Sequence, residues 1–297
     1  LLHEHLENGA DKNPNFPFSE FEGNSLSYQE ANLLSNQLAN KLVSEGLEVG
    51  DRFAFLAKNC TEMAIMYYAA SKVGAVPVPL NYRLADQEWA YIINDSEAKL
   101  IIVKGNEYSD RINQISSELK NVKKYISISL DNSIEKFQDF YDWLSDSSNE
   151  KPTLKIHEND DVYQMYTSGT TGHPKGAVLL QRNVAANIRQ YLNSLTLPRP
   201  SRTLLVAPMY HAAAMINMCG CIAIGGTIVI QEDFIPQDVV DCLANEKITH
   251  TVLVPAMIQA CLVSVPNVAN NEYYDLDLIL YGASPFAPET LKIAMVV

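Results

Sequence analysis

Basic residues are scarce in this sequence. Lys and Arg together number 22 against 35 Asp and Glu, which gives a formal net charge of −13. Proteins that follow a nucleic-acid backbone need clustered Lys and Arg. The composition therefore argues against nucleic acid as a general partner, but not against a nucleotide, which needs only a local positive site.

Long apolar segments and paired cysteines are also missing. No apolar run reaches the length of a membrane span, and the first residues do not have the pattern of a signal peptide. The five cysteines are odd in number and contain no C-x-x-C pair. We expect all five to be reduced and buried in a cytoplasmic protein, with Cys219 and Cys221 diverging on one helix.

Two common nucleotide signatures are absent as well. No G-x-G-x-x-G opens a helix, which argues against a dinucleotide fingerprint. The most distinctive stretch, residues 166–176, is not a Walker A loop, because Thr-Thr-Gly-His-Pro separates Gly169 from Lys175 and Gly176 stands where Ser or Thr would follow the lysine. Apolar, strand-like runs flank this stretch, so it is predicted to join two strands.

The composition of residues 166–176 suits a polyphosphate. Glycines let backbone N–H groups converge on an anion, hydroxyls add donors, and a lysine at about 4 Å adds roughly 4 kcal/mol before desolvation. The alternative is an ordinary Ser/Thr/Gly surface turn with a solvated lysine. The candidate phosphate ligands are Thr167, Ser168, Gly169, Thr170, Thr171, Gly172 and Lys175.

Predicted strands and helices alternate twice along the chain. This order favours an α/β fold of two doubly wound, largely parallel sheet subdomains with helices on both faces. The break at 197–202 suggests subdomains of residues 51–199 and of 1–50 plus 200–297. Residues 1–24 are predicted to be irregular, and 131–160 to be a solvated connection with a short helix. The prolines of Val76–Pro79 should keep that strand out of a central ladder.

Two further stretches follow predicted strands. One stretch ends in Tyr210-His211 and precedes an apolar helix. The other ends in Gly282-Ala283-Ser284-Pro285. In parallel sheets, ligands bind at the carboxyl ends of strands, so these segments can converge. The alternatives are a hydrogen-bonded core histidine and an ordinary turn.

Taken in order, residues 166–176, Tyr210-His211 and 281–285 resemble the signature segments of the adenylate-forming superfamily. The resemblance implies ATP-dependent activation of a carboxylic acid to acyl-AMP, followed by transfer to a thiol, most simply coenzyme A, with Mg²⁺ as cofactor. It makes Lys175 and His211 the catalytic candidates. It places the acid beside His211, Met215 and Gly282, and the adenine against Gly282, Ala283, Ser284 and Pro285.

The same resemblance bears on the substrate. Superfamily members that activate amino acids have an aspartate after the aromatic residue, where this chain has His211. A buried ammonium without a counter-charge is costly. We therefore expect a fatty or aryl acid without an α-amino group.

The resemblance covers the whole chain as an N-terminal AMP-binding domain. The segments that would follow in the superfamily, including a magnesium-binding glutamate and a C-terminal lid domain with a lysine, have no match, so we expect a truncated domain that is close to inert by itself. Alternatives within the superfamily are transfer to a carrier-protein thiol, or oxidation as in luciferase. The alternative outside it is a non-catalytic nucleotide-binding or interaction module. The oligomeric state stays open, with a homodimer among the alternatives.

Overall fold

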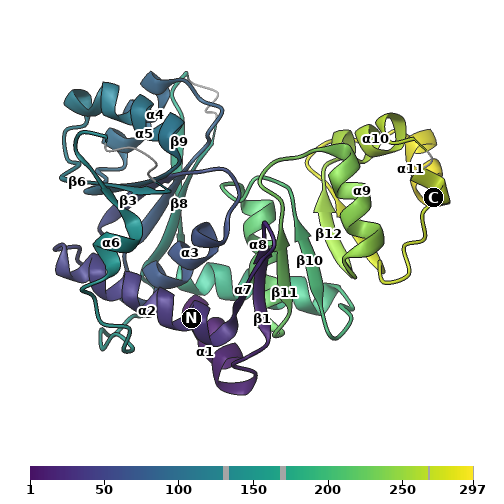
Figure 1. Ribbon diagram of the computed structural model, residues 1–297, viewed down its shortest axis with the longest axis horizontal. Helices are drawn as coiled ribbons and strands as arrows, with labels where there is room; N and C mark the ends of the chain where they lie inside the picture. Colours follow the sequence, from purple (N-terminus) through teal and green to yellow (C-terminus); the bar gives the residue numbers. More distant parts are fainter. Residues whose placement is uncertain (130–133, 168–171, 267, 297) are drawn as a thin grey trace.

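The computed structural model describes residues 1–129, 134–167, 172–266 and 268–296. It shows two lobes, each built around a sheet, with helix α3 (Thr61–Val73) between them (Figure 1). Helices lie on both faces of each sheet, which confirms the predicted doubly wound α/β class.

The sheet of the first lobe is entirely parallel, in the order β4-β3-β5-β6-β7. Strand β4, which carries Pro77 and Pro79, lies at its edge, as predicted from the missing N–H donors. The strands are β3 (Arg52–Leu56), β4 (Val76–Leu80), β5 (Leu100–Lys104), β6 (Lys124–Ile128) and β7 (Phe137–Asp139).

The sheet of the second lobe has the order β13-β12-β10-β11-β1-β2 and is parallel except for the β1–β2 pair. Its strands come from both ends of the described chain. They are β1 (Pro17–Phe21), β2 (Asn24–Ser27), β10 (Arg202–Leu205), β11 (Thr227–Ile230), β12 (His250–Leu253) and β13 (Leu278–Tyr281).

Two helix ends illustrate how local sequence sets the bounds of the helices. The Ser27 hydroxyl accepts a hydrogen bond from the N–H of Glu30, and the N–H of Ser27 donates to the Glu30 carboxylate in return. Gly74 ends α3 with φ +71°. The other α-helices are α1 (Leu2–Lys12), α2 (Tyr28–Ser44), α4 (Asp86–Asp95), α5 (Asn106–Ile115), α6 (Phe140–Leu144), α7 (Gln181–Ser194), α8 (Ala212–Ala223), α9 (Pro236–Asn245), α10 (Pro255–Ser264) and α11 (Pro288–Ala294). Two short 3₁₀ helices are η1 (Ser116–Glu118) and η2 (Val268–Asn270).

A separate antiparallel hairpin, β8 (Asp161–Thr167) and β9 (Lys175–Leu180), joins the lobes. Its register pairs Thr167 with Lys175, so the loop between them closes the hairpin. This confirms that the most distinctive stretch connects two strands.

The core explains one wrong prediction. Residues 1–24 are not irregular, because helix α1 buries Leu2 and Leu6 in the main core. Gly9 of this helix lies against the Tyr28 ring, and a Cβ on Gly9 would come within 2.3 Å of that ring. The helix was not predicted because its many polar residues and its glycine make the amphipathic pattern difficult to recognise in the sequence. Strand β1 was missed because it starts at a proline and pairs with the distant β11.

The main core runs through both sheets, so the predicted subdomain boundaries stay a prediction. All five cysteines are free and buried, and Cys219 and Cys221 have different neighbours, Met215 and Thr227. Among the described helices, none is long and apolar enough to cross a membrane.

Candidate functional site

The described part of the hairpin loop is anchored to α4. His173 stacks on Tyr91 with ring centroids 5.0 Å apart, and the Tyr91 hydroxyl donates to the carbonyl of Pro174 at 3.4 Å. Gly172 has φ +97°, a conformation that favours glycine. The predicted ligands Ser168, Gly169, Thr170 and Thr171 lie outside the described residues.

The two ends of this loop present their side chains to solvent. Thr167 and Lys175 are both exposed, at paired positions of β8 and β9. No carboxylate of the described residues forms an ion pair with Lys175. The ammonium is therefore not neutralised by a described neighbour and is available to an anion.

Gly176 has a packing role that the sequence did not suggest. A Cβ at this position would lie 2.3 Å from Nε2 of Gln164 and 2.8 Å from the Tyr166 ring. Tyr166 in turn donates from its hydroxyl to Asp95 at 2.6 Å. The glycine thus allows β9 to lie close to β8 and fixes the base of the loop.

Tyr210 and His211 follow β10 and lead into α8, where His211 is the N-cap residue. Their rings lie 5.1 Å apart, centroid to centroid. The His211 side chain is exposed, yet the protein around it removes enough hydration to lower its pKa below the ordinary 6.5. The imidazole is therefore neutral at pH 7.

Met215 lies one turn further along α8 and is 1% exposed in the main core, beside Cys219. The first two alanines of the helix, Ala212 and Ala213, are exposed instead. The open part of α8 is thus its first turn, next to His211. A contact between Met215 and a substrate stays a prediction.

Residues 282–285 follow β13, and all four are exposed. A Cβ on Gly282 would meet nothing within 4 Å, so its backbone is open to a flat ring. Ala283 has φ +69°, which is unusual for a residue with a Cβ. Such strained positions concentrate at functional sites.

The sheet brings the second and third segments to one edge. Strands β10, β12 and β13 are parallel neighbours, so Tyr210-His211 and residues 282–285 leave at the same ends of strands two places apart. At about 4.8 Å per strand, this separation is about 10 Å. That distance suits one ligand of nucleotide size.

Packing brings the hairpin close to the second segment. Tyr166 and Tyr210 both pack against the same core cluster of the first lobe, while Met165 of β8 shares the main core with Met209. The base of the loop and the histidine segment thus border the same two clusters, and their direct contact stays a prediction. The described contacts do not link the loop to residues 282–285.

An apolar cavity of about 90 Å³ lies on the other face of the second sheet, between α9, α10 and the strands, and includes Leu253, Ile258 and Ile279 in its lining. Successive side chains of a strand point to opposite faces of its sheet. In β10, Thr203 contacts Asn217 of α8, whereas Leu204 packs with the α9–α10 cluster, so α8 with His211 lies on the opposite face from the cavity. We therefore do not assign this cavity to the site.

The described residues contain no group of three or more His, Cys, Asp or Glu that could hold a metal ion. No residue of this part of the chain is therefore assigned to Mg²⁺, and we derive no step through it.

Sequence reasoning missed the residues that support the site. Asn59, Tyr67 and Tyr82 of the first lobe contact the segment that carries Tyr210-His211. Asn59 follows the carboxyl end of strand β3, and ligand-binding residues often lie at the carboxyl ends of parallel strands. This position could have marked Asn59 as a candidate from the sequence.

These features define an adenylate-forming type of α/β domain. The chain belongs to the AMP-binding enzyme family, whose sequence model matches residues 6–296.

Among its relatives, a long-chain-fatty-acid–CoA ligase, FadD13 of Mycobacterium tuberculosis, is 29% identical over 270 residues, which are 90% of this chain and 52% of that protein. A feruloyl-CoA synthase of Amycolatopsis is 30% identical over 264 residues, 89% of this chain and 50% of that protein. The solved N-terminal domain of FACL13 from M. tuberculosis superposes with a TM-score of 0.90 at 27% identity, covering 99% of this chain and 72% of that one. The chain thus spans about half the length of the curated relatives that it matches.

Proposed function

We propose that this chain carries the adenylation site of an acid–thiol ligase. A carboxylate oxygen of the substrate attacks the α-phosphorus of ATP, and the bond from that phosphorus to the pyrophosphate oxygen breaks. The products are acyl-AMP and pyrophosphate. A thiol, which we take to be that of coenzyme A, then attacks the acyl carbon, loses its proton and displaces AMP.

In this proposal the hairpin loop holds the tail of ATP. Lys175 supplies one cation to the β- and γ-phosphates, and Thr167, Gly172 and the loop between them supply hydroxyl and backbone donors. Support comes from the exposure of Lys175 and from the absence of an ion-pair partner among the described residues. A phosphate oxygen at about 4 Å would gain roughly 4 kcal/mol before desolvation.

His211 would border the reacting carboxylate. Its lowered pKa keeps the imidazole neutral at pH 7. A neutral ring does not form an ion pair with the carboxylate and so leaves the attacking oxygen nucleophilic. It also offers no counter-charge to an α-ammonium group, which supports a fatty or aryl acid as substrate.

The adenine and the start of the acyl group would lie against residues 282–285. The observation that supports the proposal is that this segment and Tyr210-His211 follow the carboxyl ends of parallel strands two places apart in one sheet, which are separated by about 10 Å. The relatives include a long-chain-fatty-acid–CoA ligase and a feruloyl-CoA synthase, which agrees with both types of acid. Near-inertness of the isolated chain, its cytoplasmic location and any homodimer stay predictions.

Binding is the suitable test, because the chain spans about half of its relatives. A hydrolysis-resistant acyl-sulfamoyl adenosine should bind with one-to-one stoichiometry in calorimetry, more tightly than ATP alone. Lys175→Ala should weaken ATP binding at least tenfold, while Lys120→Ala, on an exposed surface of the first lobe, should not. If neither nucleotide binds, the chain is not an adenylation domain.

A further inference from the structure

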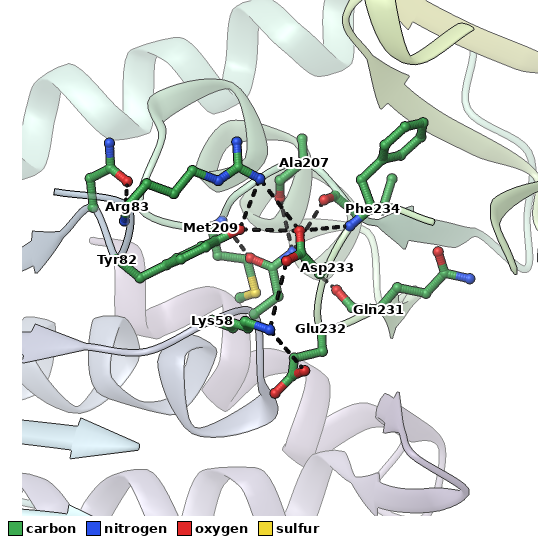
Figure 2. Close-up of polar contacts among 12 residues, drawn as sticks. Lys58, Tyr82, Arg83, Ala207, Met209, Gln231, Glu232, Asp233 and Phe234 are labelled. Atoms are coloured by element: carbon green, nitrogen blue, oxygen red, sulfur yellow. Dashed lines mark hydrogen bonds and ion pairs between the residues drawn. The ribbon is translucent and has the colours of Figure 1, made fainter. Parts of the chain in front are cut away.

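A single buried asparagine connects the first lobe to the segment that carries Tyr210-His211. Asn59 follows β3 and is 2% exposed. Its side-chain amide donates to the carbonyls of Ala207 and Gln231, each at 3.1 Å, and its oxygen accepts from the N–H of Met209 at 2.8 Å. Its backbone N–H donates to the carbonyl of Glu232 at 3.2 Å. Figure 2 shows Ala207, Met209 and Gln231 around Glu232 and Asp233.

These bonds reach the backbone immediately before the histidine. Residues 207–209 lie between the end of β10 and Tyr210-His211, and the N–H of His211 donates to the carbonyl of Pro208 at 2.9 Å. The carbonyl of Met209 accepts from the Tyr67 hydroxyl, at 3.2 Å. Both backbone polar groups of Met209 are thus bound by side chains of the first lobe.

A second set of contacts holds the Tyr210 ring. It packs edge-on against Tyr82, with centroids 5.6 Å apart, and Tyr82 donates from its hydroxyl to Asp233 at 3.2 Å. Arg83 covers the Tyr82 ring at 5.2 Å and lies 3.4 Å from the same carboxylate, which Lys58 approaches to 3.7 Å (Figure 2). The ring next to His211 is therefore held by residues of both lobes.

We propose that Asn59 is a positioning residue for the carboxylate site: it fixes residues 207–209 so that Tyr210 and His211 face the acid. The inference rests on the proposed function only for the identity of the ligand. The Asn59 side chain bonds the N–H of Met209 and the carbonyls of Val206, Ala207 and Gln231, which belong to two segments of the second lobe. An aliphatic side chain would leave these groups without this partner in a buried place, and the segment would have to rearrange to find others.

A simpler role is that Asn59 only holds the lobes together. The buried helix α3, which packs against strands of both sheets, already does this. The two roles differ in what they predict for His211, because only the positioning role changes the surroundings of that ring.

The test compares Asn59→Ala and the isosteric Asn59→Asp with Asn36→Ala. Asn36 is another buried asparagine, 4% exposed, which donates to the carbonyl of Asn149 and accepts from Lys72, and it does not contact residues 207–211. Three quantities are measured for each variant: the melting temperature, the affinity for acyl-sulfamoyl adenosine, and the titration of the His211 ring by NMR, assigned with His211→Gln.

Both Asn59 variants should lose at least tenfold in affinity and shift the His211 pKa upward toward 6.5, as the ring becomes more hydrated. Asn36→Ala should lower the melting temperature without either change. If Asn59→Ala does not fold, Asn59→Asp, which keeps the shape and the acceptor but loses the donors, decides.

Affinity within twofold of wild type together with an unchanged His211 titration in the Asn59 variants would overturn the inference. If wild type does not bind the adenylate mimic, the proposed function fails, and the His211 titration alone still decides whether Asn59 positions the segment.

Discussion

Helices α3 and α11 show how differently the middle and one end of the molecule are built. Twelve residues of α3 are buried, and the helix packs against α1, α2 and strands of both sheets. In α11, none of the described residues is buried, and Met295 just beyond it is 77% exposed. Figure 1 shows α3 between the lobes and α11 at the far end beside the C terminus. Stability is therefore concentrated in the contact between the lobes, while the segments that we assign to ligands lie on exposed edges.

The largest effect should come from the helix between the lobes. Tyr67 is fully buried, and its ring packs edge-on against Phe55 and Tyr163. Tyr67→Ala should lower the free energy of unfolding by about 3–5 kcal/mol, because it leaves a cavity in the core. The matched change in α11, Ile293→Ala, should stay within about 0.5 kcal/mol. Urea denaturation of both variants checks the comparison, and equal losses would contradict it.

Acid should destabilise the protein through a buried histidine of the second sheet. Burial lowers the pKa of His250 from 6.5 to about 4, and its Nε2 has no hydrogen-bond partner among the described residues. Between pH 6.5 and 4 the unfolded chain binds a proton that the native state does not. Stability therefore falls as the pH falls, by roughly 3 kcal/mol at pH 4 for this group.

The measurement is the free energy of unfolding against pH for wild type and His250→Leu. The variant should be less stable at pH 7 but should lose less stability on acidification. His3 on α1, whose pKa is also lowered to about 4 by burial, contributes the same pH dependence of stability in both proteins. If the free energy of unfolding falls equally steeply with pH in wild type and in His250→Leu, then the native state does not require the neutral form of His250.

Substitutions at two glycines should distinguish an effect on stability from an effect on ligand binding. Gly176→Ala places a Cβ 2.3 Å from Gln164 and should cost about 1–3 kcal/mol of stability. Gly282→Ala meets nothing within 4 Å and should leave stability unchanged while it weakens binding of an adenylate mimic. Thermal denaturation and calorimetry together test this pair. A destabilised Gly282→Ala would mean that the edge after β13 is packed rather than open.

The smallest effect should come from the ion pairs between the lobes. Lys58 lies 3.5 Å from Glu232 and is 34% exposed, so solvent screens the pair. Lys58→Ala should cost less than about 1 kcal/mol, and less still at high salt. A loss of several kcal/mol in chemical denaturation would place the main connection between the lobes in these charges instead of in the core.

The sequence was most informative where local pattern and burial agree. Strand β3 is a short apolar run and helix α3 ends at Gly74, so both elements are marked by features local to the sequence. Helix α1 and strands β1 and β7 were not predicted. Their apolar faces are short, and they form only by packing or pairing with residues far away in the sequence.

The site shows the same division. The sequence predicted a ligand site at 166–176 from composition, and at His211 and 282–285 from the family resemblance, and these assignments stay predictions. It did not identify Asn59 or Tyr82, because their roles depend on contacts with residues about 150 positions away. Nor did it show that Gly176 is required by Gln164 and Tyr166.

Hydrogen–deuterium exchange with and without an acyl-sulfamoyl adenosine tests the central claim most directly, because it reports on every backbone segment at once. The account predicts that ligand protects three separate stretches together: 166–176, 208–213 and 281–286. Protection confined to the cavity between α9 and α10, or to no segment, would contradict it.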